Sequence, residues 1–380
     1  MKTTSVLLTL WLALLLGGCA APPRVEEPER LFVDSLFKPP SRAIDADRVF
    51  AMSDAMRAYL RDEIEPLARK RGAQQALFDA LYAKGQLRLD YDNSRTRNAA
   101  EAFEARSGNC MSLLIMTGAF AQSLGLKVHY QTVLTDEAWA KSDNLYFAIG
   151  HVNIRLGQPR PGWEGSWMTI DFLPGQNLAR QQVRQIDEAR VLAMFMNNRS
   201  AEALSRGDLD EAYAWVRAAS RADPQFAAVY NTLGVVYLHH GALAEAEKAL
   251  RAAHGLEPDN PHALGNLVQV LLRQGRDVEA QGLRAALERL QPTPPFALFE
   301  QGRQAMRDGN FRRARQLFEA EIARSPDYHE FHFWLALAHL QLGETRAAER
   351  ELQAALASST TPEQHAIYAG KLEKLKAAVH

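Results

Sequence analysis

Residues 225–258 read QFAAVYNTLGVVYLHHGALAEAEKALRAAHGLEP, and the glycine, alanine and proline of this stretch recur along the second half of the chain. The recurrences are spaced by 34 residues and comprise Gly207, Gly241, Gly275, Gly309 and Gly343; Ala212, Ala246, Ala280, Ala314 and Ala348; and Pro224, Pro258, Pro292 and Pro326. Three residue types that keep one period in this way indicate an internal repeat. We therefore expect a stack of equivalent structural units.

A period of 34 residues is similar to that of the tetratricopeptide (TPR) helix-turn-helix. There the glycine closes the first helix in a left-handed conformation, the alanine lets two helices approach, and the proline stops the second helix. The second copy matches the pattern at Tyr230, Leu233, Gly234, Tyr237, Ala246, Leu250, Ala253 and Pro258. Departures are Arg199 and Ser200 in the first copy and Arg284 in the third. The resemblance implies an all-α TPR solenoid over residues 190–380, with five repeats and a capping helix at 362–377.

Solenoids of this kind present a concave groove that binds an extended peptide or a partner helix. We therefore expect a protein or peptide partner, with a spacer or a dimerisation surface as the alternative, because a fold does not by itself specify a function. The chain has 44 Lys and Arg against 45 Asp and Glu. Without a basic excess, nucleic acid is excluded as a partner.

The N-terminus has the pattern of a bacterial lipoprotein. Lys2 is followed by an apolar run over residues 6–16, too short to span a bilayer, and then by Leu16-Gly17-Gly18-Cys19, which resembles a lipobox. We expect a signal peptide at 1–18, acylated Cys19, and a Pro-rich tether over 19–45. Ala20 favours the periplasmic face of the outer membrane. An ordinary signal peptide with an incidental cysteine is the alternative.

Cys110 is the only other cysteine of the chain. If Cys19 carries lipid, Cys110 has no disulfide partner in an oxidising compartment, so it is either buried and inert or retained for chemistry. Ser107-Gly108-Asn109 breaks a helical stretch over 99–105, and an apolar run then leads to Gly125. The pattern places Cys110 at a helix N-terminus, where the dipole and free amides favour the thiolate.

Three strands are expected after this helix, over residues 127–134, 151–156 and 167–172. Alternation puts His151 and Asp171 on the polar faces of the second and third strands. If these strands pair, the carboxylate orients the imidazole, which then activates the Cys110 thiol. His129 on the first strand is a competing base, and Tyr91 is a candidate to face the nucleophile. The pairs His239 and His240, and His329 and His332, have no metal-ligand spacing.

The segments Arg106-Ser107-Gly108-Asn109-Cys110-Met111-Ser112-Leu113, Gly150-His151-Val152 and Ile170-Asp171-Phe172 resemble the transglutaminase-like (papain-related) superfamily. The resemblance implies an α+β domain over residues 46–185 with Cys110, His151 and Asp171 as catalytic residues, and neither a metal nor an organic cofactor. Asn109, where aspartate is usual, and Val152-Asn153 depart from the family pattern. The implied function is periplasmic, cysteine-dependent amide or peptide hydrolysis. Transglutaminase-type acyl transfer and a non-catalytic TPR scaffold are the alternatives.

Overall fold

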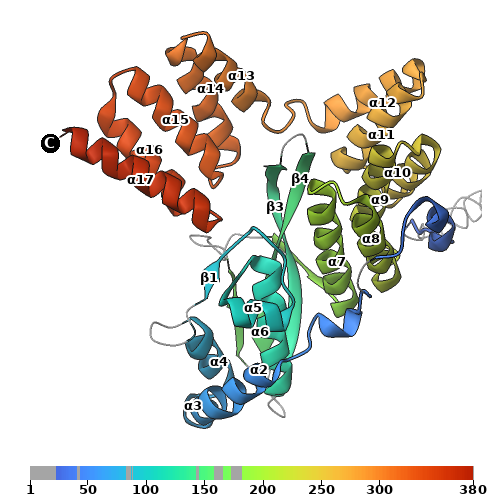
Figure 1. The fold of residues 1–380 in the computed structure, drawn as a ribbon, viewed down its shortest axis with the longest axis vertical. Helices are drawn as coiled ribbons and strands as arrows, with labels where there is room; N and C mark the ends of the chain where they lie inside the picture. Colours follow the sequence, from blue (N-terminus) through green and yellow to red (C-terminus); the bar gives the residue numbers. More distant parts are fainter. Residues whose placement is uncertain are drawn as a thin grey trace, which may run out of the picture.

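The computed structural model describes residues 23–40, 43–82, 87, 89–142, 145–157, 166–172 and 182–379. The predicted signal peptide and Cys19 lie outside these residues. The described chain is mostly helical, with a small sheet region followed by a TPR-like helical solenoid (Figure 1). Within the described residues, no helix combines the length and the apolar character needed to cross a bilayer.

Short helices open the region before the repeats. These are α2 (Asp54–Tyr59), a π-helical turn η4 (Leu60–Ile64), α3 (Glu65–Arg71) and α4 (Ala73–Tyr82). Gly72 ends α3 with a φ of 84°, a conformation that glycine adopts without a steric cost. Helices α5 (Ala99–Ala105) and α6 (Cys110–Ser123) follow, and twelve of the fourteen residues of α6 are buried. Helix α6 is therefore the central helix of this region.

A four-stranded antiparallel sheet packs against α6 in the order β5-β4-β3-β6. Its strands are β3 (Lys127–Ser142), β4 (Leu145–Gly157), β5 (Trp167–Ile170) and β6 (Gln182–Ile186). Strands β3 and β4 cover the predicted strands at 127–134 and 151–156 and extend beyond them, whereas β5 ends at Ile170, so Asp171 of the predicted strand 167–172 directly follows the strand. A two-residue parallel pair, β1 (Asp90–Tyr91) and β2 (Ser107–Gly108), lies beside α6. The likeness of this region to the papain-related fold remains a prediction.

Ten helices form the five repeats, and an eleventh closes the stack. They are α7 (Glu188–Ser205), α8 (Leu209–Ala222), α9 (Ala227–His240), α10 (Leu243–Leu256), α11 (Pro261–Arg273), α12 (Asp277–Leu290), α13 (Ala297–Arg307), α14 (Phe311–Arg324), α15 (His329–Gln341), α16 (Thr345–Ala357) and α17 (Pro362–Val379). The five repeat glycines all have positive φ, which confirms their predicted position between paired helices.

The third repeat differs from the others at one contact between its paired helices. In the second repeat Gly234 lies against Leu250, and two periods later Gly302 lies against Phe318. The third repeat has Val268 and Arg284 at these two positions. A bulky residue opposite a charged one cannot form the same close contact, and Ala280 is the only buried residue of α12.

The hydrophobic core of the solenoid is correspondingly divided between α12 and α13. Most buried residues from α7 to α12 share one cluster with the N-terminal region, and a small cluster around Tyr230 adjoins the same helices, whereas α13 to α17 are buried in two further clusters. Figure 1 shows α13 displaced from α12 across the linker at 291–296. The backbone N–H of Asn93 donates to the carbonyl of Thr360 at 2.8 Å, so the end of the array returns to the N-terminal region.

The predicted tether over residues 19–45 requires correction. Two 3₁₀ turns, η1 (Pro28–Leu31) and η2 (Asp34–Leu36), lie on α8, α9 and α10 (Figure 1). The composition is that of a linker, but Leu31, Phe32, Leu36 and Phe37 are partly buried against the repeats. Burial of these apolar side chains explains why the segment is docked rather than extended in solvent.

Candidate functional site

The start of α6 is built by a sharp change of backbone direction. Arg106 ends α5 in a left-handed conformation, with φ of 52°, and the β2 pair follows. Position 108 has room only for glycine, because a Cβ atom there would lie 2.6 Å from Cβ of Ser112. Cys110 is the first residue of α6, as predicted, and it is only 6% exposed.

Asn109 caps α6 and connects it to the loop before α5. Its Oδ1 accepts hydrogen bonds from the backbone N–H of Ser112 at 2.9 Å and from the Ser112 hydroxyl at 2.8 Å. Its Nδ2 donates to Oγ1 of Thr96 at 2.9 Å. All three side chains are buried. An aspartate could cap the helix but could not donate to Thr96, so the asparagine has a structural function here.

The sheet brings His151 and Asp171 together. Strand β4 pairs with β5 so that Ile154 lies opposite Ile170, and alternation then puts Asp171 on the face of the sheet that His151 occupies. Nε2 of His151 lies 2.7 Å from Oδ2 of Asp171, and their side chains are 3% and 5% exposed. Strand alternation predicted this pair on the condition that the two strands are neighbours, and the transglutaminase-like resemblance implied the same two residues.

The electrostatics of His151 join this pair to Cys110. Burial disfavours the imidazolium, but the hydrogen bond to Asp171 and the interaction with Cys110 outweigh it and raise the pKa of His151 to about 9. Its Nδ1 is buried and has no hydrogen-bond partner among the described residues. The ring therefore uses one nitrogen for the carboxylate, and its other nitrogen is unpaired there.

Tyr91 is a further residue of the site. Strand β1 pairs Tyr91 with Gly108, two residues before Cys110. Burial raises the pKa of the Tyr91 phenol, and the nearby Cys110 and Asp171 raise it further. The phenol thus remains protonated and can donate a hydrogen bond toward a group bound at the sulfur.

Two other polar residues of the sheet differ in their relation to the site. Asn153 shares the His151 face of β4, is 1% exposed, and its Oδ1 has no hydrogen-bond partner among the described residues. In the sequence, only its place in the polar and apolar alternation of the strand could have indicated that Asn153 lies on the His151 face. His129, the competing base, instead stacks on Trp167 with ring centroids 4.3 Å apart. His151 is therefore the imidazole that interacts with Cys110.

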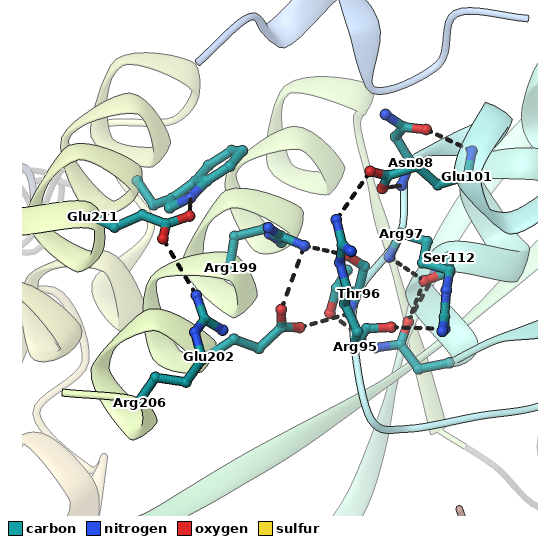
Figure 2. A network of polar contacts seen from close by, with 12 residues as sticks. Arg95, Thr96, Arg97, Asn98, Glu101, Ser112, Arg199, Glu202, Arg206 and Glu211 are labelled. Carbon is teal, nitrogen blue, oxygen red and sulfur yellow. Dashed lines mark hydrogen bonds and ion pairs between the residues drawn. The ribbon is translucent and has the colours of Figure 1, made fainter. Parts of the chain in front are cut away.

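The first repeat contacts the loop that supports this helix start (Figure 2). The carboxylate of Glu202 accepts the backbone N–H of Thr96 at 2.6 Å, and Nη1 of Arg199 donates to the Thr96 carbonyl at 3.1 Å. Both side chains come from α7. Because Thr96 also accepts the hydrogen bond from Asn109, two residues link the repeats to the N-cap of α6. Sequence reasoning missed this contact, since Thr96 and Glu202 are 106 residues apart.

Comparison with protein families matches tetratricopeptide repeats at residues 199–255 and 299–370, and a second tetratricopeptide repeat family at residues 237–298. These matches run from α7 into α17. No curated protein matches the chain.

Several solved structures are similar to parts of the chain. A MamA protein is 18% identical, with 44% of this chain and 91% of that chain covered and a TM-score of 0.24. YrrB, titled a TPR protein with an unusual peptide-binding site, is 20% identical, with coverages of 47% and 92% and a TM-score of 0.26. Pseudomonas aeruginosa pilF is 19% identical, with coverages of 50% and 92% and a TM-score of 0.28.

Proposed function

Because its C-terminal region consists of TPR repeats, we propose that this chain is a protein-interaction scaffold whose repeats bind a protein or peptide partner. The observation that carries this proposal is the family match over residues 199–370. First helices of neighbouring repeats lie side by side, and Nδ2 of Asn266 on α11 donates to Oδ1 of Asn231 on α9 at 2.9 Å. Solenoids bind partners on an extended concave surface, and the proposal places the partner on this row of first helices.

Photo-crosslinking in cells tests the scaffold function. A photoreactive residue at Asn231 should give discrete adducts with a partner, whereas one at Glu288, an exposed position of α12 outside the row of first helices, should not. The same adducts at both positions, or none at Asn231, would contradict binding on the row of first helices.

A second function is favoured by the geometry around Cys110, and we propose that this region is a cysteine-dependent amide or peptide hydrolase. The supporting observation is the buried His151–Asp171 pair, with its electrostatic interaction with a thiol at a helix N-terminus. Backbone amides at that terminus would stabilise the oxyanion of a tetrahedral intermediate. Asp171 would orient His151 and stabilise its charged form.

The proposed reaction follows from these positions. The Cys110 thiolate forms a C–S bond to the amide carbon, and His151 gives its proton to the nitrogen as the C–N bond breaks. Water then attacks the thioester while His151 accepts its proton, and the C–S bond breaks to release the acid and restore the Cys110 thiolate and protonated His151. Resolution of the same intermediate by an amine would instead be acyl transfer.

Turnover of a peptide library by the purified chain tests the hydrolase. Hydrolysis should be lost in Cys110→Ala and retained in His129→Ala, because His129 stacks on Trp167 instead of serving the thiol. Products that form only when a lysine analogue is added would assign acyl transfer. Absence of any Cys110-dependent product would leave the scaffold as the function.

We further propose that Cys19 carries a lipid that holds the chain at the periplasmic face of the outer membrane. The lipobox-like Leu16-Gly17-Gly18-Cys19 supports this. Cys19→Ser should move the protein from the membrane fraction to the soluble periplasmic fraction. Persistent membrane attachment of this variant would contradict lipid anchoring.

A further inference from the structure

The segment at residues 25–38 is held on the repeats through its backbone. The Tyr237 hydroxyl accepts the N–H of Val33 and donates to the carbonyl of Leu31, both at 2.9 Å. The Gln225 side chain likewise accepts from the N–H of Val25 at 3.2 Å and donates to its carbonyl at 3.3 Å. These hydrogen bonds hold the backbone of the segment, so its selectivity comes from the side-chain contacts.

Apolar side chains of the same segment occupy the surface between α8 and α10. Phe37 stacks on Tyr213, with ring centroids 4.1 Å apart and an interplanar angle of 10°, and its ring also contacts His240. Phe32 meets Tyr213 edge-on at 5.9 Å. Leu31 packs on the cluster formed by Tyr230, Ala253 and Ala263. Two apolar pairs, Leu31-Phe32 and Leu36-Phe37, are thus bound five residues apart.

Charge complements these contacts. Arg217 lies 3.1 Å from both Glu29 and Asp34, and its guanidinium lies over the Phe32 ring. The Tyr213 hydroxyl donates to Asp34 at 2.7 Å. The surface therefore selects an acidic residue between two bulky apolar pairs.

We propose that the groove formed by α8, α9 and α10, here called the strap groove, is a peptide-binding site whose resident ligand is the chain's own segment 25–38. A partner protein with an extended segment of the same chemistry binds there by displacing the resident. This inference rests on the proposed interaction role of the repeats. It adds the surface that binds the partner, the chemistry of the bound segment, and regulation of binding by the chain's own segment. The resident is covalently attached, so its effective concentration is high, and it competes with any partner. Its two 3₁₀ turns are three and four residues long, and none of the residues in these turns is buried. Release uncovers Tyr213 and Tyr237, which a partner segment of the same chemistry covers again.

Fluorescence anisotropy with a labelled synthetic peptide of residues 24–40 tests the site. The full chain should bind it weakly, because the groove is occupied. The double variant Leu31→Ala/Phe37→Ala weakens only the contacts of the resident segment with the groove. It should bind the labelled peptide at least tenfold more tightly than the unaltered chain does. Adding Tyr237→Phe to that variant should weaken binding about tenfold, because the ring is kept and two hydrogen bonds are lost. A control peptide with serine at both Leu-Phe pairs should not bind.

Several outcomes would overturn the proposal. The proposal fails if the double variant binds the peptide no more tightly than the unaltered chain does. It also fails if the double variant binds the control peptide as tightly as the native-sequence peptide. A double variant that loses its helical circular dichroism would show that the segment belongs to the core. Exchange of the segment between two copies, seen as a dimer, would assign the displacing ligand to a second copy. Peptide binding is measured without turnover or crosslinking, so failure here leaves the tests at Asn231 and Cys110 independent.

Discussion

His151 and Asp171 form a buried contact of 2.7 Å between Nε2 and Oδ2. Asp171 and Cys110 both stabilise the charged form of this imidazole. The carboxylate holds one ring nitrogen, and Cys110 interacts with the same ring. A buried imidazole without such partners would be neutral at pH 7, because burial lowers its pKa. The contact therefore makes two predictions, one on stability and one on the thiol.

The first prediction concerns stability against pH. His151 has a pKa of about 9 in the folded chain against 6.5 as its ordinary value. The unfolded chain loses this proton at lower pH, so the stabilisation is complete below pH 6.5 and is lost as the pH rises to about 9. Asp171→Asn should lower the free energy of unfolding by up to about 3 kcal/mol at pH 6.5, and by much less at pH 9.5.

Urea unfolding at the two pH values measures this difference. Asp54→Asn, which alters a carboxylate that is 99% exposed, is the matched control and should give a small difference at both. A difference for Asp171→Asn that stayed constant or grew with pH would exclude a charged imidazole partner.

The second prediction concerns the thiol. In a Cys19→Ser chain Cys110 is the only cysteine, so alkylation reports on it alone. A neighbouring imidazolium favours the thiolate, which is the reactive form. Iodoacetamide should modify the folded chain at pH 6 at least tenfold faster than it modifies His151→Ala. Equal rates in the two chains, with the denatured protein as reference, would be incompatible with the proposed triad.

Local patterns in the sequence were sufficient to predict much of the candidate site. Ser107-Gly108-Asn109 marked the start of α6, and strand alternation put His151 and Asp171 on one face, because both signals depend on residues close in the chain. The Thr96–Glu202 contact could not be predicted in this way. A side chain that binds a distant backbone group leaves no periodic pattern in the sequence.

The solenoid, too, could be predicted only in part from local patterns. The 34-residue period predicted the five helix pairs and the glycines between them, and Arg284 was identified as a departure from the pattern. The separation of α12 from α13 could not be predicted, because it depends on how far two packed helices can approach. The composition of residues 19–45 likewise predicted a tether, since proline and charge outnumber the few apolar residues that dock on the repeats.

The third prediction tests the link between the repeats and the site. Glu202→Ala removes the acceptor of the buried Thr96 N–H and the partner of Arg199. An unpaired buried donor costs about 1–3 kcal/mol, so the free energy of unfolding should fall by that amount. Because Thr96 holds the N-cap Asn109, Cys110 alkylation should also slow. Glu211→Ala, another carboxylate on the first repeat, is the control and should leave the alkylation rate unchanged. Loss of stability with an unchanged alkylation rate would confine Glu202 to a structural role.

The fourth prediction concerns helix packing in the second repeat. A Cβ atom at Gly234 would lie 2.4 Å from Cγ of Leu250, whereas one at Gly265 would lie 3.7 Å from Cδ2 of Leu287, which is ordinary contact. Gly234→Ala should therefore destabilise the chain by about 1–3 kcal/mol through overpacking. Gly265→Ala should be neutral or stabilise it by up to about 1 kcal/mol, because alanine favours helix. Equal effects of the two substitutions would contradict the close approach of α9 and α10.

The fifth prediction follows from the division of the solenoid's hydrophobic core between α12 and α13. Leu250 and Phe318 occupy the same position two repeats apart and are fully buried, but they lie in different clusters. Because the repeats from α13 onward share little core with those up to α12, the chain should unfold in two transitions. Each substitution leaves a cavity, so the free energy of unfolding should fall by about 2–5 kcal/mol for Leu250→Ala and by about 3–5 kcal/mol for Phe318→Ala. Scanning calorimetry should show that each substitution lowers the midpoint of a different transition. A single transition lowered by both would mean that the Val268–Arg284 position does not separate the array, and that the contact between Asn93 and Thr360 couples its ends into one cooperative unit.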